Sequence, residues 1–269
     1  MIPRPSMLPL AIAALLAVGC SAQGPEPEAE AGALLTLGSL QFKPCSLASP
    51  LPQGQPLEAQ CTTLVVPEDR NAPGGRRIAL NIAWIPARNS SDPAPDPIVF
   101  LAGGPGQAAV ATFPGLAPVF RDVMKDRGVL LVDQRGTGKS NLLNCKAEDS
   151  EQFGSDPAAA RTWIEGCVAE LSAKADLRRY TTTDAVADLE AVRQAIGADT
   201  LNLVGVSYGT RMAQQYALRH PQRVRTLTLD SPVPNTVGLG NIVAGNLDSA
   251  LQAQFALCKE SPACSSRMG

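Results

Sequence analysis

Five residues in the second half of the chain have the types and spacing of a nucleophile turn. The motif Gly205-Val206-Ser207-Tyr208-Gly209 follows the apolar run Leu201–Val206, which we expect to be a strand, and begins a segment with helical spacing from Tyr208 to Arg219. A serine on a tight strand-to-helix turn projects its hydroxyl from the sheet edge, and glycines on either side let the backbone fold closely. The sequence therefore predicts Ser207 as a nucleophile for acyl transfer.

Attack by a serine creates an oxyanion that needs hydrogen-bond donors. The backbone N–H of Tyr208 lies at the start of the expected helix, where unpaired donors and the helix dipole favour negative charge. A second group of glycines, Gly103-Gly104-Pro105-Gly106, follows the short apolar run Ile98–Ala102. Glycine lets the backbone approach a substrate carbonyl, and proline stiffens the loop. We expect Gly104, or alternatively Gly103, to supply the second N–H.

A serine nucleophile also needs a general base, and the only histidine in the sequence is His220. It lies at the far end of the helix that Ser207 begins, roughly 20 Å from the hydroxyl at a rise of ~1.5 Å per residue. Proton transfer needs about 3 Å. We therefore interpret His220 as a surface residue at a helix end. Asp230 ends the next predicted strand and is the candidate for the catalytic acid.

Four motifs occur in order within about half of the chain, from Cys61 to Asp230: Gly103-Gly-Pro-Gly106, Asp133-Gln-Arg-Gly-Thr-Gly-Lys-Ser140, Tyr180-Thr181 with Asp188-Leu-Glu190 and Arg193, and Gly205-Val-Ser-Tyr-Gly-Thr210. In these motifs the sequence resembles the prolyl and tripeptidyl aminopeptidase branch of the α/β-hydrolases. The resemblance implies an α/β-hydrolase fold, no cofactor, and a peptide or small ester or amide substrate. Peptides would be cleaved near their N-terminus through an acyl-enzyme on Ser207.

One residue departs from the family pattern. Ala102 stands where proline-specific members commonly carry histidine. The departure favours the tripeptidyl or broader exported members. The resemblance also implies that the acid and the histidine come from later strands, so Asp230 matches the position used by some lipases rather than that of this family.

The loop from Asp133 to Ser140 ends in Gly138-Lys139-Ser140, which is also the end of a phosphate-binding loop. That motif needs glycine at position 133, and an aspartate there would repel phosphate. We therefore expect Asp133 and Arg135 to be structural residues that fix a loop beside the nucleophile.

Strand and helix patterns alternate through the chain. We expect strands at 61–66, 77–85, 98–102, 128–132, 201–206 and 224–229, and helices at 116–125, 158–173, 183–196, 208–219 and 247–259. Thr183 is the expected N-cap of the third of these helices, and Gly197 its stop. Because helices separate the later strands, the pattern predicts a mostly parallel sheet with an antiparallel N-terminal hairpin.

The first residues have the features of an export signal. Arg4 precedes an apolar run from Leu8 to Val18 that is too short to span a bilayer. The run ends at Cys20 in a sequence that resembles a bacterial lipobox. This resemblance predicts a periplasmic protein whose membrane contact is a lipid anchor on Cys20. An ordinary signal peptide cut nearby is the alternative. We divide the chain into the signal (1–20), a flexible Pro- and Glu-rich tether (21–37), the hydrolase core (38–236) and the beginning of a helical cap (237–269).

Six cysteines remain beyond Cys20, an even number that fits an oxidising compartment. Pairing of nearest neighbours predicts the disulfides Cys45–Cys61, Cys145–Cys167 and Cys258–Cys264. One histidine and no Cys-x-x-Cys motif make zinc binding unexpected. A net charge of −2 provides no basic stripe for nucleic acid.

Only 39 residues follow Asp230, fewer than two further strand–helix units need. We expect the chain to stop at the start of the cap, and to lack the acid and histidine that complete the site. Three interpretations stay open: an incomplete exported peptidase, inactive alone; an esterase-like hydrolase whose base comes from elsewhere, such as a partner chain; and a non-catalytic envelope lipoprotein that uses the scaffold for binding.

Overall fold

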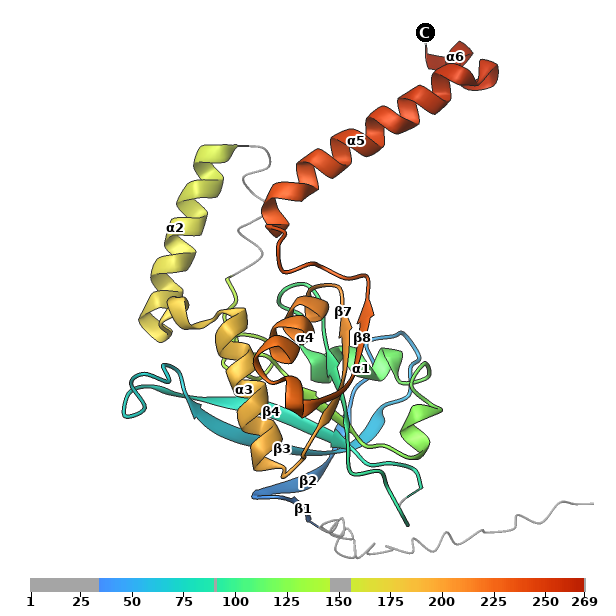
Figure 1. Cartoon of the computed structure of the whole chain (residues 1–269). Helices are drawn as coiled ribbons and strands as arrows, with labels where there is room; N and C mark the ends of the chain where they lie inside the picture. The colour runs from blue at the N-terminus through green and yellow to red at the C-terminus, as the bar shows by residue number, and fades with distance from the viewer. Residues whose placement is uncertain (1–33, 90, 146–155, 269) are drawn as a thin grey trace, which may run out of the picture. The chain divides into compact units, whose positions relative to one another are not determined.

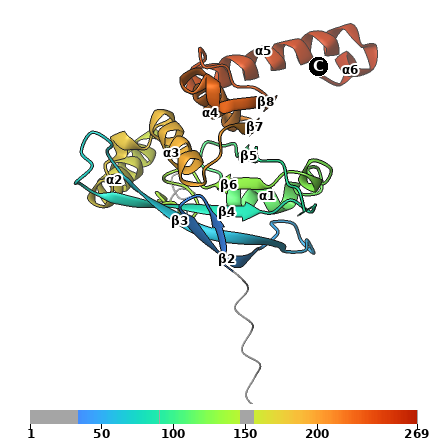
Figure 2. The same cartoon turned by 60° about the horizontal axis from the view of Figure 1, so that its bottom comes forward.

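The computed structural model describes residues 34–89, 91–145 and 156–268. These residues build one mixed eight-stranded sheet in the order β1-β2-β3-β4-β6-β5-β7-β8. Figure 2 shows the later strand labels following one another across the sheet in this order. The expected α/β-hydrolase architecture is confirmed, with strands and helices alternating from β5 onward. The export signal, Cys20 and most of the expected tether lie outside the described residues.

The first half of the sheet is antiparallel. It consists of β1 (Leu35–Leu37), β2 (Leu40–Leu47), β3 (Leu57–Pro67) and β4 (Arg77–Ile85). The antiparallel N-terminal part is larger than the expected hairpin of β3 and β4, because β1 and β2 pair antiparallel with their neighbours as well. The expected tether also extends too far, since its last residues form β1. Leu35 and Leu37 are half-buried against the core, which gives this short strand an apolar partner.

The second half of the sheet is parallel. It consists of β5 (Ile98–Leu101), β6 (Val129–Val132), β7 (Leu201–Val206) and β8 (Val224–Asp230). Strands β5 and β6 are buried along their whole length, as uninterrupted apolar runs predict. Consecutive residues face opposite sides, so both faces must be covered. In β5, Val99 and Leu101 join one core cluster, whereas Ile98 and Phe100 join the other.

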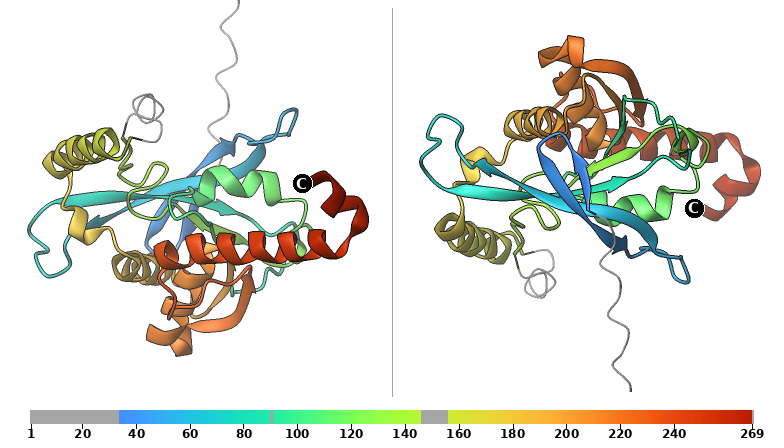
Figure 3. Two further views of the ribbon diagram at one scale, coloured as in Figure 1. Left: turned by 90° about the horizontal axis from the view of Figure 1, so that it is seen from above. Right: turned by 90° about the horizontal axis from the view of Figure 1, so that it is seen from below.

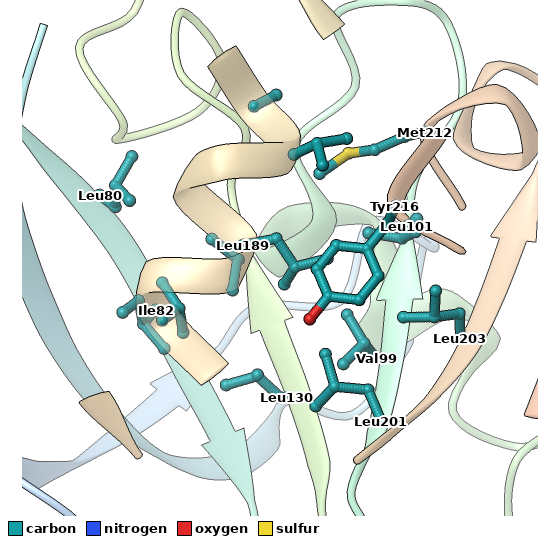
Figure 4. Packing of buried hydrophobic residues seen from close by; sticks show 14 of the residues in the cluster. Leu80, Ile82, Val99, Leu101, Leu130, Leu189, Leu201, Leu203, Met212 and Tyr216 are labelled. Carbon is teal, nitrogen blue, oxygen red and sulfur yellow. The ribbon is translucent and has the colours of Figure 1, made fainter. Parts of the chain in front are cut away.

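The helices are α1 (Ala109–Leu116), α2 (Pro157–Lys174), α3 (Thr182–Ala195), α4 (Tyr208–Arg219), α5 (Leu239–Glu260) and α6 (Pro262–Met268), with short 3-10 turns η1 (Val123–Lys125), η3 (Leu177–Arg179) and η4 (Pro221–Arg223). Residues of α3 and α4 pack on one face of the sheet and those of α1 on the other. Figure 4 shows Leu189 of α3 and Met212 and Tyr216 of α4 around the side chains of β4, β5, β6 and β7.

Three helix boundaries differ from expectation. The helix expected at 116–125 was wrong: α1 spans Ala109–Leu116, and the residues after it form turns and the 3-10 turn η1. The N-cap of α3 is Thr181 rather than Thr183, since the Thr181 side chain accepts a hydrogen bond from the Asp184 N–H. Gly197, at φ +74°, follows the end of α3 as expected. Helix α5 begins at Leu239, eight residues before the expected start at Leu247.

Most side chains of α2 and α5 whose burial is described are exposed. No residue of α2 is buried, and Ile164 and Val168 on its expected apolar side are 52% and 47% exposed. In α5, Leu247 and Leu251 are 60% and 46% exposed. The segment after α2 is held at the end of β3 by the hydrogen bond from the Asp176 N–H to Glu68, and Figure 3 shows the two segments side by side. None of the described helices is long and apolar enough to cross a membrane.

The three expected disulfides are present. Cys45–Cys61 joins β2 to β3, Cys145–Cys167 ties α2 to the chain before it, and Cys258–Cys264 closes the turn between α5 and α6. The Cα atoms of the pairs are 5.8, 5.7 and 5.1 Å apart, within the usual range for a disulfide. In the structure each of these cysteines thus pairs with its expected nearest neighbour.

Helix α3 is joined to α4 by the carboxylate of Glu190. It accepts hydrogen bonds from the hydroxyl of buried Tyr216 at 2.7 Å, from Arg193 at 2.7 and 2.8 Å, and from Gln194 at 2.9 Å. Burial alone would raise the pKa of Glu190, but the hydrogen bonds from Arg193 and Tyr216 outweigh it and hold the pKa at about 2. The ionised carboxylate is thus favoured in the folded state.

Glu190→Gln is expected to lower the free energy of unfolding at pH 7 by about 1–3 kcal/mol, because charge-assisted bonds to buried groups are lost. A folded pKa below the unfolded value of about 4.5 stabilises the protein above pH 4.5, and this contribution fades as the pH falls towards 2. Urea midpoints measured between pH 7 and pH 3 should therefore converge for wild type and variant at low pH. A difference that stays constant with pH would contradict this role of the carboxylate.

Candidate active site

Three loops meet at one edge of the sheet, at the carboxyl ends of adjacent parallel strands. Strands β6, β5 and β7 are neighbours, and each ends in one of the motifs found in the sequence. Residues 103–106 follow β5, residues 133–140 follow β6, and Ser207 follows β7. Ligands of open α/β sheets bind at this edge. Figure 1 shows β7 leading directly into α4, which begins one residue after Ser207.

Ser207 has the backbone conformation of a strained nucleophile turn. Its φ is +53° and its ψ −120°, a region that side-chain-bearing residues rarely adopt. Glycine is required on either side because a Cβ at these positions would collide with neighbouring backbone atoms. A Cβ on Gly205 would lie 2.6 Å from the Gly209 carbonyl oxygen, and a Cβ on Gly209 would lie 2.0 Å from the Leu101 carbonyl oxygen. Glycine at position 205 therefore lets β7 approach the first turn of α4, and glycine at position 209 lets that turn pack against β5.

The strained turn is held by hydrogen bonds on both sides. The Ser207 N–H donates to the Asp230 carbonyl at 2.9 Å, which ties the turn to β8. The Ser207 carbonyl accepts from the N–H of Thr210 at 3.0 Å and from its hydroxyl. The same hydroxyl accepts from the Val233 N–H at 2.8 Å, and Thr210 is fully buried. The surrounding structure thus fixes the Ser207 backbone.

The loop after β5 lies directly against Ser207. A Cβ added to Gly103 would lie 3.1 Å from the Ser207 Cβ, so the two backbones approach closely. Gly104 has a φ of +103° and is followed by a cis peptide bond to Pro105. Among the described residues, the N–H groups of Gly103, Gly104 and Tyr208 donate no hydrogen bond. The structure therefore brings the three expected oxyanion donors together with the nucleophile, while their roles in catalysis stay predictions.

The loop after β6 is organised around the carboxylate of Asp133. One oxygen accepts from the Val110 N–H in the first turn of α1 at 2.9 Å, and the other accepts from the Asn81 side chain at 2.8 Å and from the Lys139 N–H at 3.2 Å. A Cβ on Gly138 would lie 2.3 Å from the same carboxylate. A carboxylate thus fills the loop where a phosphate-binding loop would hold its anion, which agrees with a structural role for Asp133.

Arg135 fixes the same loop from the other side. Its side chain is 1% exposed and forms two parallel hydrogen bonds to Asp188 of α3, at 2.6 and 2.7 Å. Its remaining nitrogen donates to the carbonyls of Glu68 and Arg179, both at 2.8 Å. Burial alone would lower the pKa of Arg135, but Asp188 outweighs burial and raises it. Arg135 is a structural residue, as expected, and is permanently charged.

Several members of this buried network were missed by the sequence analysis. Arg70 donates to Asp188, and Glu68 accepts from the Tyr180 hydroxyl at 3.0 Å. Both residues follow β3, more than 100 positions from their partners. Tyr180 and Asp188 belong to the motifs shared with the aminopeptidase branch. Glu68 and Arg70 carry no local signal, because an ion pair across such a separation is visible only once the fold brings its members together.

No side chain in the described residues forms a hydrogen bond with the Ser207 hydroxyl. His220 lies at the opposite end of α4, where its ring lies tilted against that of Tyr216 with the ring centroids 5.0 Å apart, far from the nucleophile turn. Asp230 lies beside Ser207 through its backbone, but its exposed carboxylate accepts only from the Ser231 hydroxyl, at 3.0 Å. Its role as an acid stays a prediction. Among the described residues there is also no cluster of three or more side chains able to hold a metal ion.

A cleft of about 250 Å³ opens beside the nucleophile turn. It lies among all three loops and the start of α3, and its lining includes Pro105, Gly106, Gln134, Tyr180 and Tyr208. The Tyr208 hydroxyl is hydrogen-bonded to the Thr182 hydroxyl at 2.6 Å, which fixes one wall. The cleft touches both the loop after β5 and Tyr208, the residue next to Ser207.

A model of a known protein family matches the part of the chain that holds the parallel strands and the nucleophile turn. The family model described as alpha/beta hydrolase fold matches residues 96–264, from β5 to α6. The chain belongs to the α/β-hydrolase family. The match covers the loops after β5 and β6 as well as Ser207, so the candidate site lies within the part that the family shares.

Curated relatives carry peptidase names. The chain is 30% identical over 253 residues to serine protease Hip1 of Mycobacterium tuberculosis, covering 84% of this chain and 46% of the relative. It is 29% identical over 197 residues to tripeptidyl aminopeptidase of Streptomyces lividans, covering 66% and 36%. It is 32% identical over 142 residues to proline iminopeptidase of Neisseria gonorrhoeae, covering 52% and 34%. The chain thus spans about half the length, or less, of these relatives.

Proposed function

We propose that this α/β-hydrolase chain carries the nucleophile and oxyanion donors of an exported serine peptidase that releases N-terminal residues or tripeptides. The observation that carries the proposal is Ser207 on its strained turn, in contact with Gly103 and next to three backbone N–H groups without partners. The peptidase names of the relatives support the substrate class. Ala102, in place of the histidine common in proline-specific members, favours the tripeptidyl type.

The reaction would proceed through an acyl-enzyme. The Ser207 hydroxyl oxygen bonds to the substrate carbonyl carbon while its proton passes to a base, and two N–H groups stabilise the oxyanion. Collapse of the intermediate breaks the carbon–nitrogen bond, and the leaving amine takes the proton. Water then releases the acyl group. The base in this proposal comes from outside the 269 residues, either from further polypeptide or from a partner chain, because His220 lies at the wrong end of α4.

The cellular place proposed for this activity is the periplasm, with a lipid anchor on Cys20. The three disulfides favour an oxidising compartment. Metabolic labelling with a fatty acid tests the anchor: the label should be incorporated by wild type and lost in Cys20→Ser. Equal labelling of both proteins would contradict a lipid anchor at this residue.

Turnover in imidazole buffer tests the proposed function, because imidazole can replace a missing histidine as a diffusible base. Tripeptidyl and aminoacyl amides are expected to be cleaved slowly by the wild-type chain and not by Ser207→Ala. Turnover of esters alone would favour the esterase-like alternative. No Ser207-dependent turnover of either class, with the protein shown to be folded, would favour the non-catalytic binding module.

A further inference from the structure

The cleft beside Ser207 is built to receive an uncharged group. Its volume, about 250 Å³, lies just below the range of about 300–1,000 Å³ that holds a whole drug-sized ligand, so it suits one residue of a larger substrate. Much of its wall is apolar or aromatic, formed by Pro105, Leu143, Tyr180, Ala185 and Tyr208. A peptide side chain that enters such a cleft leaves water, and a charged one would have to lose its hydration.

The one charged side chain in the wall cannot pair with a ligand. Arg135 uses its Nε and Nη2 atoms on Asp188 and its Nη1 on two backbone carbonyls. Its charge is thus already balanced by a buried carboxylate. The Tyr180 hydroxyl is likewise bonded to Glu68, and burial together with this bond raises the pKa of Tyr180 to about 12, so the phenol is neutral at ordinary pH.

The other polar side chains of the wall are occupied, with one exception. The Thr137 hydroxyl donates to the Gln134 carbonyl, the Thr181 hydroxyl to Asp184, and the Tyr208 hydroxyl is paired with Thr182. The Gln134 side chain is half-buried and makes no hydrogen bond within the described residues. Its amide can both donate and accept. Among the described side chains of the wall, the Gln134 amide is therefore the one neutral group left without a hydrogen-bond partner.

We propose that this cleft is a specificity subsite, in which the uncharged wall and the Gln134 amide select a neutral residue flanking the scissile bond. The inference rests on the proposed function, since it needs Ser207 to react. Gln134 would be the specificity-determining residue, because a charge placed there would have no buried partner of its own and would attract a substrate group of opposite sign.

Organophosphorus probes that phosphonylate a nucleophilic serine test the subsite. Fluorophosphonates whose two arms are both neutral, both cationic or both anionic would be compared in imidazole buffer, with Ser207 labelling quantified by peptide mass spectrometry. Wild type is expected to react about tenfold faster with the neutral probe than with either charged one. In Gln134→Glu the cationic probe should gain about tenfold relative to the neutral probe, and in Gln134→Lys the anionic probe should gain similarly.

Gln107→Glu is the matched control. Gln107 is exposed and lies close to Gly103, but it does not line the cleft, so it adds the same charge near Ser207 without placing it in the subsite. Its probe preferences should remain those of wild type. Equal rates for the three probes on wild type, or the same shift in Gln107→Glu as in Gln134→Glu, would overturn the subsite while leaving Ser207 as the nucleophile. Failure of all probes to label Ser207 would overturn the proposed function and the subsite together.

Discussion

Gly209→Ala is expected to disrupt the fold around the nucleophile more than any other single methyl group added to the chain. Its Cβ would lie 2.0 Å from the Leu101 carbonyl oxygen and 2.8 Å from that of Ala102. Both atoms belong to the backbone at the end of buried β5, so no flexible side chain can move aside. Relief requires α4 to shift away from the sheet, at a cost of about 3 kcal/mol or more in the free energy of unfolding. Urea unfolding followed by circular dichroism measures this loss.

The control for this prediction is Gly166→Ala. Gly166 lies within α2, and nothing comes within 4 Å of a Cβ at this position. Alanine favours a helix interior over glycine by up to about 1 kcal/mol, so the variant should be unchanged or slightly more stable. Unfolding of both variants at the same urea concentration would contradict the prediction, because it would mean that packing of the nucleophile turn against β5 does not require glycine at position 209.

Asp188→Asn is expected to have the second largest effect. The carboxylate is 3% exposed and balances Arg135 in a two-bond pair, with Arg70 as a further partner. Asparagine keeps the shape but leaves a buried guanidinium without a counter-charge. Removing one partner of a buried pair costs about 3–5 kcal/mol. Because Arg135 anchors the loop after β6, the variant should also lower the labelling rate of Ser207.

Asp122→Asn controls for the loss of a carboxylate as such. Asp122 pairs with Lys125 on the surface, where both side chains are largely exposed. Solvent and salt screen such a pair, so the urea midpoint should not change measurably. A fall in the midpoint as large as that of Asp188→Asn would show that net charge, rather than the buried pair, sets the stability.

The sequence predicted those parts of the fold whose signal is local. Strand β7 and helix α4 have the bounds expected for them, because an apolar run and a helical pattern meet at a motif that fixes the turn between them. The disulfides were also predictable, since each closes a short loop. The N-cap of α3 was misplaced by two residues because Thr181 and Thr183 are equally suitable caps, and only the structure shows that Thr181 accepts the bond.

The parts that the sequence did not predict depend on contacts between distant segments. The strands β1 and β2 extend the antiparallel half of the sheet because Leu40 and Phe42 reach the core, which no short-range pattern reveals. No short-range pattern reveals the hydrogen bonds that join Glu68 to Asp176 and Arg70 to Asp188 either. In the candidate site, the nucleophile and its donors were predictable from the spacing of the glycines. The pairing of Arg135 with Asp188, which neutralises the charge in the cleft wall, became visible only in the structure.

The pH dependence of fluorophosphonate labelling tests most directly the claim that Ser207 is a placed nucleophile whose base lies outside these residues. Without an internal base, the Ser207 labelling rate should rise about tenfold per pH unit from pH 6 to pH 9 with no plateau, increase with added imidazole, and be unaffected by His220→Gln. Ser207→Ala should remove the adduct. A plateau near neutral pH that imidazole does not change would mean that the chain supplies its own base, and an adduct on other serines in place of Ser207 would contradict the nucleophile itself.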